Sequence, residues 1–210
     1  MAGATGLVGS RVVDVLLADP DYDAIHVVVR HPLSMHHARL REHIVDFAQL
    51  AAFDWPAVDD AYCCLGTTIK ATGSRDAFRR VDFDYPLAIA RGAQDHGARQ
   101  FLFVSAMGAD ARSPVFYSRV KGELESAVAV LGYGAAIAFR PSLLAGDRVE
   151  QRTGERIALA VMQPLRRLVP RKYRPVSDVA VARAMVAFAK RGVKGFHIVS
   201  SDEIQAFAPG

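Results

Sequence analysis

The sequence of 210 residues predicts an α/β fold in which helices cover both faces of a parallel sheet. Three observations carry this prediction. Short apolar runs alternate with longer amphipathic stretches, the hydrophobic content of 51% is enough to fill one core, and three glycines open the chain directly before its first helical stretch. We therefore expect a single domain over residues 1–210, with a doubly wound sheet and no internal repeat.

The elements follow from apolar spacing and turn residues. The first helix is expected at Ser10 to Ala18, where apolar residues lie between polar ones and Asp19-Pro20 ends the pattern. Buried strands are expected where short apolar runs end in turn residues: Ile25 to Val29, Ala61 to Leu65, Phe101 to Val104, Ala135 to Phe139 and Phe196 to Val199. Further helices are expected at Asp76 to His96, Val115 to Leu131 and Val179 to Lys190.

The segment from Ala145 to Pro175 breaks this alternation. It mixes charges, Gly and Pro around one helical patch, Glu155 to Leu168. Material inserted after a late strand of a doubly wound sheet overhangs the carboxyl ends of the strands, where ligands bind. We predict that residues 145–175 form a small substrate lid.

The opening segment predicts a phosphate-binding loop. Gly3, Gly6 and Gly9 form a Gly-x-x-Gly-x-x-Gly pattern around Thr5 and the pair Leu7-Val8, immediately before the first helix. Glycines permit a tight turn and a close approach of backbone to a pyrophosphate, and the helix N-terminus offers unpaired N–H groups. A plain turn is the alternative, but the βαβ context favours a Rossmann-like dinucleotide-binding domain.

Two residues at this end of the chain refine the prediction. Arg30 ends the next strand, where an acidic residue would bind a free ribose 2′-hydroxyl, whereas Arg neutralises a 2′-phosphate. NADP(H) is therefore expected in preference to NAD(H), with Arg11 or His31 as further candidates for the same phosphate. Only Met1 and Ala2 precede the first glycine, so either the start lies upstream or the central strand is short.

A second group of residues predicts acid–base chemistry. Tyr117 and Lys121 stand four residues apart and share a helix face, and Ser105 ends an apolar run upstream. A cation beside a phenol favours the phenolate and brings the phenol closer to acid–base work at neutral pH. Each residue also has a plain structural interpretation. Ser105 could start a turn, Tyr117 could be a surface tyrosine, and Lys121 could be a solvated helix residue that interacts with Glu125.

The composition and the residue spacing argue against several other classes of protein. The net charge of +4 comes mostly from scattered Arg without a nucleic-acid-binding module, and no run approaches a bilayer-spanning length. We expect no nucleic-acid or membrane partner, and a cytoplasmic location. Cys63 and Cys64 are adjacent and lack the spacing of metal ligands or a disulfide framework. His31, His36 and His37 lie close together but without matching carboxylates or thiols, so no metal is expected.

Several motifs together resemble a known family. They are the glycines at Gly3 to Gly9, Cys63 to Lys70, Val81 to Pro86, Val104 to Ala106, Phe116 to Glu125 and Arg140 to Leu144. In this order, and at strand ends and helix starts, they resemble the atypical short-chain dehydrogenase/reductases, and within them bacterial relatives of the NADPH-binding Tat-interactive oxidoreductase-like group. The resemblance spans nearly the whole chain.

The resemblance implies roles for individual residues. Tyr117 would donate a proton to a substrate carbonyl oxygen, Lys121 would hold the nicotinamide ribose and lower the pKa of Tyr117, and Ser105 would hydrogen-bond the same substrate oxygen. The other residues implied to border the cofactor follow two later strands: Leu65, Gly66 and Thr67, then Pro141, Ser142 and Leu143. The family's Asn on the preceding long helix is not evident, and Asp82 lies near its expected place.

The leading prediction is an NADP(H)-dependent oxidoreductase, a short-chain dehydrogenase/reductase that moves hydride between nicotinamide and a small carbonyl or alcohol. The alternative is an NADPH-binding sensor or interaction module with little or no catalysis. A nucleotide-sugar epimerase shares the fold and triad, but the short segment after Ala145 leaves little room for a sugar nucleotide. A protein partner or a homodimer stays open.

Overall fold

The computed structural model describes residues 1–145 and 170–209, and its centre is a parallel sheet. In spatial order its strands are β2 (Leu40–Ile44), β1 (Ile25–Val29), β3 (Asp60–Cys63), β4 (Gln100–Val104), β5 (Ala135–Arg140) and β8 (Gly195–Ser200). Ala2 lies between β1 and β3 and pairs in parallel with Val28 and Cys63. The predicted α/β, Rossmann-like, doubly wound fold is confirmed.

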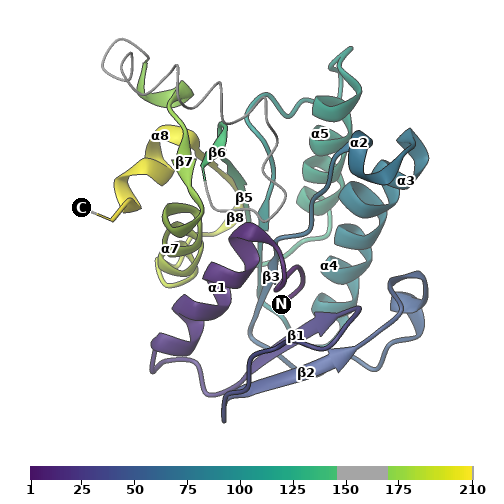
Figure 1. The fold of residues 1–210 in the computed structure, drawn as a ribbon, viewed down its shortest axis with the longest axis vertical. Coiled ribbons are helices and arrows are strands. Elements are labelled where there is room, and N and C mark those ends of the chain that lie inside the picture. Colours follow the sequence, from purple (N-terminus) through teal and green to yellow (C-terminus); the bar gives the residue numbers. More distant parts are fainter. Residues whose placement is uncertain (146–169, 210) are drawn as a thin grey trace.

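Helices cover both faces of the sheet (Figure 1). Helices α1 (Leu7–Ala18) and α7 (Asp178–Ala189) lie on one face, and α4 (Tyr85–Asp95) and α5 (Phe116–Ala129) lie on the other. Each face has its own apolar cluster: Leu16, Val27 and Met185 belong to the first, and Ala2, Ile89 and Leu124 to the second. Burial of this apolar surface on both sides is what holds the parallel strands in the interior.

The other described elements are short. They are η1 (Phe47–Ala52), α2 (Ile69–Thr72), α3 (Arg75–Arg79), η2 (Arg80–Asp84), β6 (Leu144–Ala145), η3 (Arg171–Tyr173), β7 (Val176–Ser177), α8 (Ser201–Ile204) and η4 (Gln205–Phe207).

The long helix expected at Asp76 to His96 is not continuous. It consists of α3, a π-helical turn η2 and α4. The reason is Pro86: it has no N–H to donate to the carbonyl of Asp82 four residues earlier, so regular α-helical bonding cannot run through this point. The irregular turn leaves the side chain of Asp82 completely buried.

Two other expectations need correction. Helix α1 starts at Leu7, three residues before the expected Ser10, because Gly6 serves as its N-cap. Strand β2 was not expected from the sequence. It is an edge strand whose residues are half-buried or exposed, so it lacks the apolar run that marks the inner strands.

Met1 and Ala2 lie in the middle of the sheet, between β1 and β3. The N–H of Ala2 donates to the carbonyl of Tyr62 (2.8 Å), and the carbonyl of Ala2 accepts from Cys64 (2.9 Å). On the other side, Val28 donates to the carbonyl of Met1 (2.8 Å). These bonds join β1 to β3 at the end of the strands that leads into the glycine loop.

The predicted lid lies mostly outside the described residues, which exclude 146–169, and so does the expected helical patch Glu155 to Leu168. The two flanks of that segment meet, because Leu144 of β6 pairs with Val176 of β7. The described residues on either side of it, Leu144 and Val176, are therefore neighbours beyond β5. Its function as a lid stays a prediction.

The histidine pair of β1 and β2 predicts a pH dependence of stability. His26 Nδ1 lies 2.9 Å from His43 Nε2, and burial, followed for His26 by the charge of His43, lowers the pKa of both from 6.5. Folding therefore favours the neutral rings. Their contribution to stability is present above about pH 6.5 and is lost as the pH falls through the lowered folded-state values.

We therefore expect the melting temperature to fall between pH 7.5 and 5.5, and His43→Gln to reduce that fall. Thermal unfolding followed by circular dichroism at both pH values measures the effect. The matched change at the exposed His36 serves as a control. An equal fall in wild type and His43→Gln would contradict the prediction.

Candidate active site

The candidate site lies where the order of the strands reverses. From Ala2 the chain passes to β1 and β2 on one side and then returns to β3, β4 and β5 on the other. The loops that follow the strand at Ala2 and strands β1, β3, β4 and β5 meet at the carboxyl edge of the sheet, which is where doubly wound folds bind ligands. Every residue that the sequence assigned to the site follows one of these strands or lies on α1 or α5.

The glycine loop has the geometry of an anion cradle. Gly3 has a φ of +85°, and a Cβ built on it would lie 2.6 Å from the carbonyl carbon of Cys64. A Cβ on Gly9 would lie 1.9 Å from the carbonyl oxygen of Gly3, so the first turn of α1 packs directly on the loop. The N-cap, Gly6, gives no side-chain cap to α1, and the first N–H groups of the helix therefore remain available to an anion.

Arg30 lies beside this loop. It follows β1 directly, two residues after Val28, which is the partner of Ala2, and it is exposed. Within residues 1–145 and 170–209, no acidic side chain forms an ion pair with it. Arg11 differs from Arg30, because its guanidinium forms ion pairs with Asp178 (3.2 Å) and Asp14 (3.4 Å) of the protein itself.

Lys121 is buried and ion-paired. Its side chain is 3% exposed, and its Nζ lies 2.8 Å from Oδ1 of Asp82, whose other oxygen accepts from the N–H of Thr67 (2.9 Å). Burial lowers the pKa of Lys121, but the negative charges of Asp82 and of an ionised Tyr117, with the hydrogen bond to Asp82, outweigh it and raise the pKa. Lys121 is therefore a fixed cation at the floor of the site.

Gly66 connects this ion pair to the loop after β3. A Cβ on Gly66 would lie 3.7 Å from Oδ1 of Asp82 and 3.8 Å from Nζ of Lys121. The predicted cofactor-bordering residues Leu65, Gly66 and Thr67 are therefore next to Lys121, although 54 positions separate Thr67 from it in the sequence.

Tyr117 lies one helical turn before Lys121, at the start of α5. It is 37% exposed, and its ring lies 5.7 Å from that of Phe78 on α3. The phenol is thus positioned by a ring contact on one side and is open to solvent at the edge of the site.

Gly122, on the other side of α5, allows the chain at Asp110 and Ala111 to pack closely against this helix. A Cβ on Gly122 would lie 2.2 Å from both residues.

Ser105 is part of a buried polar cluster that the sequence did not predict. Its hydroxyl donates to Oε1 of Glu125 (2.5 Å), and Glu125 is held by two bonds from Arg140, Nε to Oε1 (2.9 Å) and Nη2 to Oε2 (2.5 Å). The hydrogen bond to Glu125 is the main reason that the pKa of Arg140 is raised. The one available signal was the spacing, because Glu125 is four residues after Lys121 and shares the helix face of Tyr117 and Lys121.

The segment after β5 is anchored beside Ser105. The carbonyl of Pro141 accepts from Met107 (3.0 Å), the hydroxyl of Ser142 donates to the carbonyl of Arg174 (2.5 Å), and the carbonyl of Leu143 accepts from Val176 (2.9 Å). The segment from Pro141 to Leu143 therefore borders the site as a fixed wall.

Cys63 ends β3 and is buried. Burial raises the pKa of Cys63 to about 11, which favours the unreactive thiol. No group of three potential metal ligands occurs among residues 1–145 and 170–209, and no helix there is both long and apolar enough to cross a bilayer.

The fold and the site define a dinucleotide-binding protein with an oxidoreductase-like architecture. Residues 3–130 match the family model described as NAD(P)H-binding, and the chain belongs to that family. HTATIP2 of Rattus norvegicus is 35% identical over 162 residues, which cover 74% of this chain and 66% of that protein. FMP52 of Emericella nidulans, named as mitochondrial, is 30% identical over 166 residues, covering 75% and 71%.

The solved structures support the fold. A short-chain dehydrogenase family protein from Francisella tularensis superposes with a TM-score of 0.73 at 12% identity, covering 96% of each chain. At this identity the likeness concerns the fold alone.

These comparisons correct two expectations. The expected cytoplasmic location is contradicted, because FMP52 proteins of several fungi, to which this chain is similar, are named mitochondrial. The compartment of a domain like this one is set by targeting signals and not by its core, so the composition of the sequence could not reveal it. The likeness to the HTATIP2 group is supported. The relatives named above are mammalian and fungal, so they do not support the expected likeness to bacterial relatives.

The buried ion pair predicts a strong coupling between two residues. Asp82→Ala would leave the ammonium of Lys121 buried and unpaired, and we expect the free energy of unfolding to fall by about 3–5 kcal/mol. Adding Lys121→Met removes the stranded charge, so the double variant should lose less stability than the sum of the single variants. Urea unfolding of the four proteins measures the cycle, and strict additivity would show that the two groups do not interact.

Proposed function

We propose that the protein is an NADP(H)-dependent oxidoreductase that transfers hydride between nicotinamide and a small carbonyl or alcohol substrate. One observation carries the proposal. Tyr117 and Lys121 occupy one face of α5, Lys121 lies next to Gly66, and the glycine loop opens at the same edge of the sheet. This observation supports a proton donor and a fixed cation acting beside a bound dinucleotide, which is the arrangement that carbonyl reduction requires.

The cradle fits a dinucleotide. The segment from Gly3 to Gly9 and the open N-terminus of α1 would hold the pyrophosphate, with Thr5, Leu7 and Val8 alongside it. The residues that would border the nicotinamide half are Leu65, Gly66, Thr67, Pro141, Ser142, Leu143 and Lys121. When bound, the cofactor supplies or accepts the hydride.

The chain's own residues would manage the proton. In the direction of reduction, the hydroxyl of Tyr117 donates its proton to the carbonyl oxygen as negative charge develops there. Lys121 remains charged because of Asp82, so it stabilises the phenolate that Tyr117 becomes and offers its remaining N–H groups to ribose hydroxyls. Asp82 holds Lys121 in place and makes no contact with the substrate in this scheme.

The role of Ser105 in this mechanism is restricted by its hydrogen bond. Its single hydroxyl hydrogen is directed to Glu125, which Arg140 holds in position. To donate to a substrate oxygen, Ser105 must turn this hydrogen away from Glu125. In its present orientation it offers only lone pairs, which suits an alcohol donor or the hydroxyl of Tyr117.

The Ser105–Glu125 bond also supports the second candidate function, an NADPH-binding sensor or interaction module with little catalysis. Two of the three expected catalytic groups, Ser105 and Lys121, are paired with buried carboxylates of the protein itself. HTATIP2 and FMP52 are likewise named without an activity. The exposed phenol of Tyr117 above a buried cation favours the enzyme, because a sensor has no chemical use for it.

The central test is removal of the phenol. Tyr117→Phe keeps the ring contact with Phe78 but removes the proton donor, so turnover should fall by about 10²- to 10⁴-fold. NADPH oxidation against a panel of aldehydes and ketones measures turnover, and fluorescence titration measures NADPH binding, which should change little. Unchanged turnover in a variant that binds NADPH would refute the mechanism, and NADPH binding by a wild type without turnover would favour the sensor.

The cofactor preference is tested at Arg30. Arg30→Glu should weaken NADPH binding by about tenfold or more, because a charge-assisted contact with the 2′-phosphate is replaced by repulsion, and should affect NADH much less. The control is Arg99→Glu, which makes the same change of charge at the opposite edge of the sheet, before β4. Equal effects of Arg30→Glu on the two cofactors would remove Arg30 from the 2′-phosphate site.

A further inference from the structure

Two hydroxyl groups on the wall of the candidate site are bonded within the protein. Ser105 donates its hydroxyl hydrogen to Glu125, and Ser142 donates its own to the carbonyl of Arg174 (2.5 Å). A hydroxyl has only one hydrogen to donate, so neither serine can donate to a substrate oxygen without breaking a bond inside the protein. A substrate with many hydroxyl groups, which needs both donors and acceptors around it, is therefore poorly matched by this wall.

Apolar side chains, in contrast, are exposed in the segments next to Tyr117. Met107 is 40% exposed, Val115 is 58% exposed and Ile69 is 38% exposed. They belong to three different segments: the loop after β4, the N-cap of α5 and the first residue of α2. Exposed apolar side chains that gather at a ligand-binding edge indicate a surface that an apolar ligand covers.

Main-chain contacts place Met107 beside the first turns of α5. Its N–H donates to the carbonyl of Pro141 (3.0 Å), and a Cβ built on the next residue, Gly108, would lie 4.0 Å from the hydroxyl oxygen of Ser118. Met107 therefore connects the wall that follows β5 to the part of α5 that carries Tyr117.

Ile69 approaches the site from the side of β3. It follows Thr67 by two residues, and the N–H of Thr67 is bonded to Asp82 (2.9 Å). Helix α2, which Ile69 begins, contacts α3, and Phe78 of α3 packs against the ring of Tyr117 (5.7 Å). Figure 1 shows α2 and α3 beside α5. Exposed apolar surface thus lies near the phenol in the segments after both β3 and β4.

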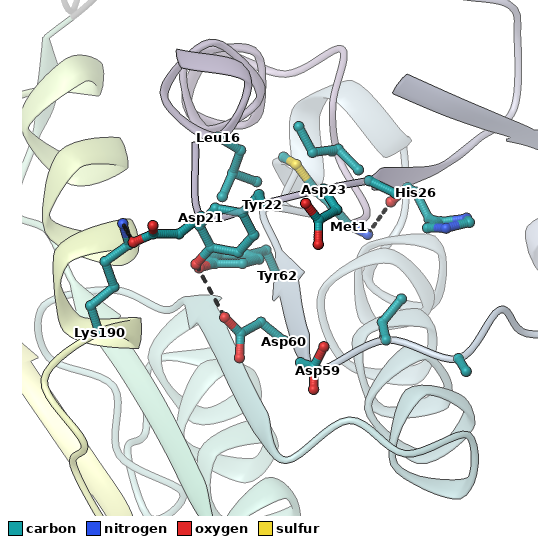
Figure 2. Close-up of a pocket in the computed structure, with 14 residues that line it drawn as sticks. Met1, Leu16, Asp21, Tyr22, Asp23, His26, Asp59, Asp60, Tyr62 and Lys190 are labelled. Carbon is teal, nitrogen blue, oxygen red and sulfur yellow. Dashed lines mark hydrogen bonds and ion pairs between the residues drawn. The ribbon is translucent and has the colours of Figure 1, made fainter. Parts of the chain in front are cut away.

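The cavity at the amino edge of the sheet has a different lining. Figure 2 shows this cavity, of about 440 Å³, with Asp21, Asp23, Asp59 and Asp60 among its lining residues. Carboxylates disfavour an apolar ligand, because they lose hydration when an apolar group covers them. The apolar surface near Tyr117 is therefore a property of the candidate site and is not shared by both edges of the sheet.

We propose that the site takes an apolar carbonyl compound, an aldehyde or ketone with an alkyl chain, in preference to a hydroxylated one such as a sugar. The proposal rests on the proposed function, in which the hydroxyl of Tyr117 meets the carbonyl oxygen. With the oxygen at Tyr117, the alkyl chain covers Met107 and the apolar residues next to it. Met107 determines the specificity, and its flexible thioether adapts to chains of different length.

The kinetic test follows NADPH oxidation with straight-chain aldehydes from propanal to hexanal, and with glyceraldehyde, the hydroxylated counterpart of propanal. We expect kcat/KM to rise about two- to fourfold per methylene group, and propanal to be preferred over glyceraldehyde. Met107→Gln keeps the length of the side chain but makes its end polar. The rise per methylene group should therefore become smaller, mainly through KM.

The matched control is Met35→Gln. It makes the same change at a methionine of nearly equal exposure, 38%, outside the proposed site. The rise of kcat/KM with chain length should be the same in this variant as in the wild type.

A second measurement needs no turnover. The methyl groups of the five methionines are labelled with ¹³C, and the protein with NADPH is titrated with hexanamide and with acetamide, two carbonyl compounds that are not reduced. Hexanamide should shift the methyl signal of Met107, which is identified by its loss in Met107→Gln, and leave that of Met35 in place. It should bind about tenfold or more tightly than acetamide, because it buries four more methylene groups.

The outcomes separate this proposal from the proposed function. Aldehyde turnover with a kcat/KM that does not change with chain length, or with a preference for glyceraldehyde, would overturn the proposal and leave the hydride transfer standing. Tighter binding of hexanamide at Met107 without turnover of any aldehyde would support the apolar site and refute the hydride transfer. Hexanamide that leaves the Met107 signal in place would overturn the proposal, as would a dependence on chain length that Met107→Gln does not change.

Discussion

The candidate site depends on the buried ion pair between Lys121 and Asp82. Lys121 comes from α5, Asp82 from the π-helical turn before α4, and the second oxygen of Asp82 binds the main chain at Thr67, after β3. Three segments far apart in the sequence are thereby fixed around one charge. A buried ammonium without a partner would be strongly unfavourable, so the charge of Lys121 depends on Asp82.

The position of Asp82 comes from a local defect in a helix. Pro86 interrupts regular helical bonding, the chain forms a wider turn, and the carboxylate is directed inward. The sequence placed Asp82 near the position where the family has an Asn, but an Asn could only hydrogen-bond Lys121. A carboxylate neutralises it, which makes the cation in this site more firmly fixed than one held by a neutral amide.

The two edges of the sheet have opposite characters. At the carboxyl edge the glycine loop, Arg30 and Lys121 provide N–H groups and positive charge suited to phosphates. At the amino edge a cavity is lined by the carboxylates of Asp21, Asp23, Asp59 and Asp60. The position of Ala2 between β1 and β3 brings the glycine loop to the carboxyl edge (Figure 1).

The sequence by itself determined the α/β class, the inner strands, the glycine loop and the shared face of Tyr117 and Lys121, because each depends on short-range spacing. It did not predict the edge strand β2, whose exposed residues lack an apolar run, or the break at Pro86 within the expected long helix. Only the tertiary structure decided that Ser105 binds Glu125, that Glu125 is held by Arg140, and that Lys121 pairs with Asp82 and not with Glu125. The partners of buried charges are chosen by which strand ends and helices the sheet brings together, and one-dimensional spacing does not contain that information.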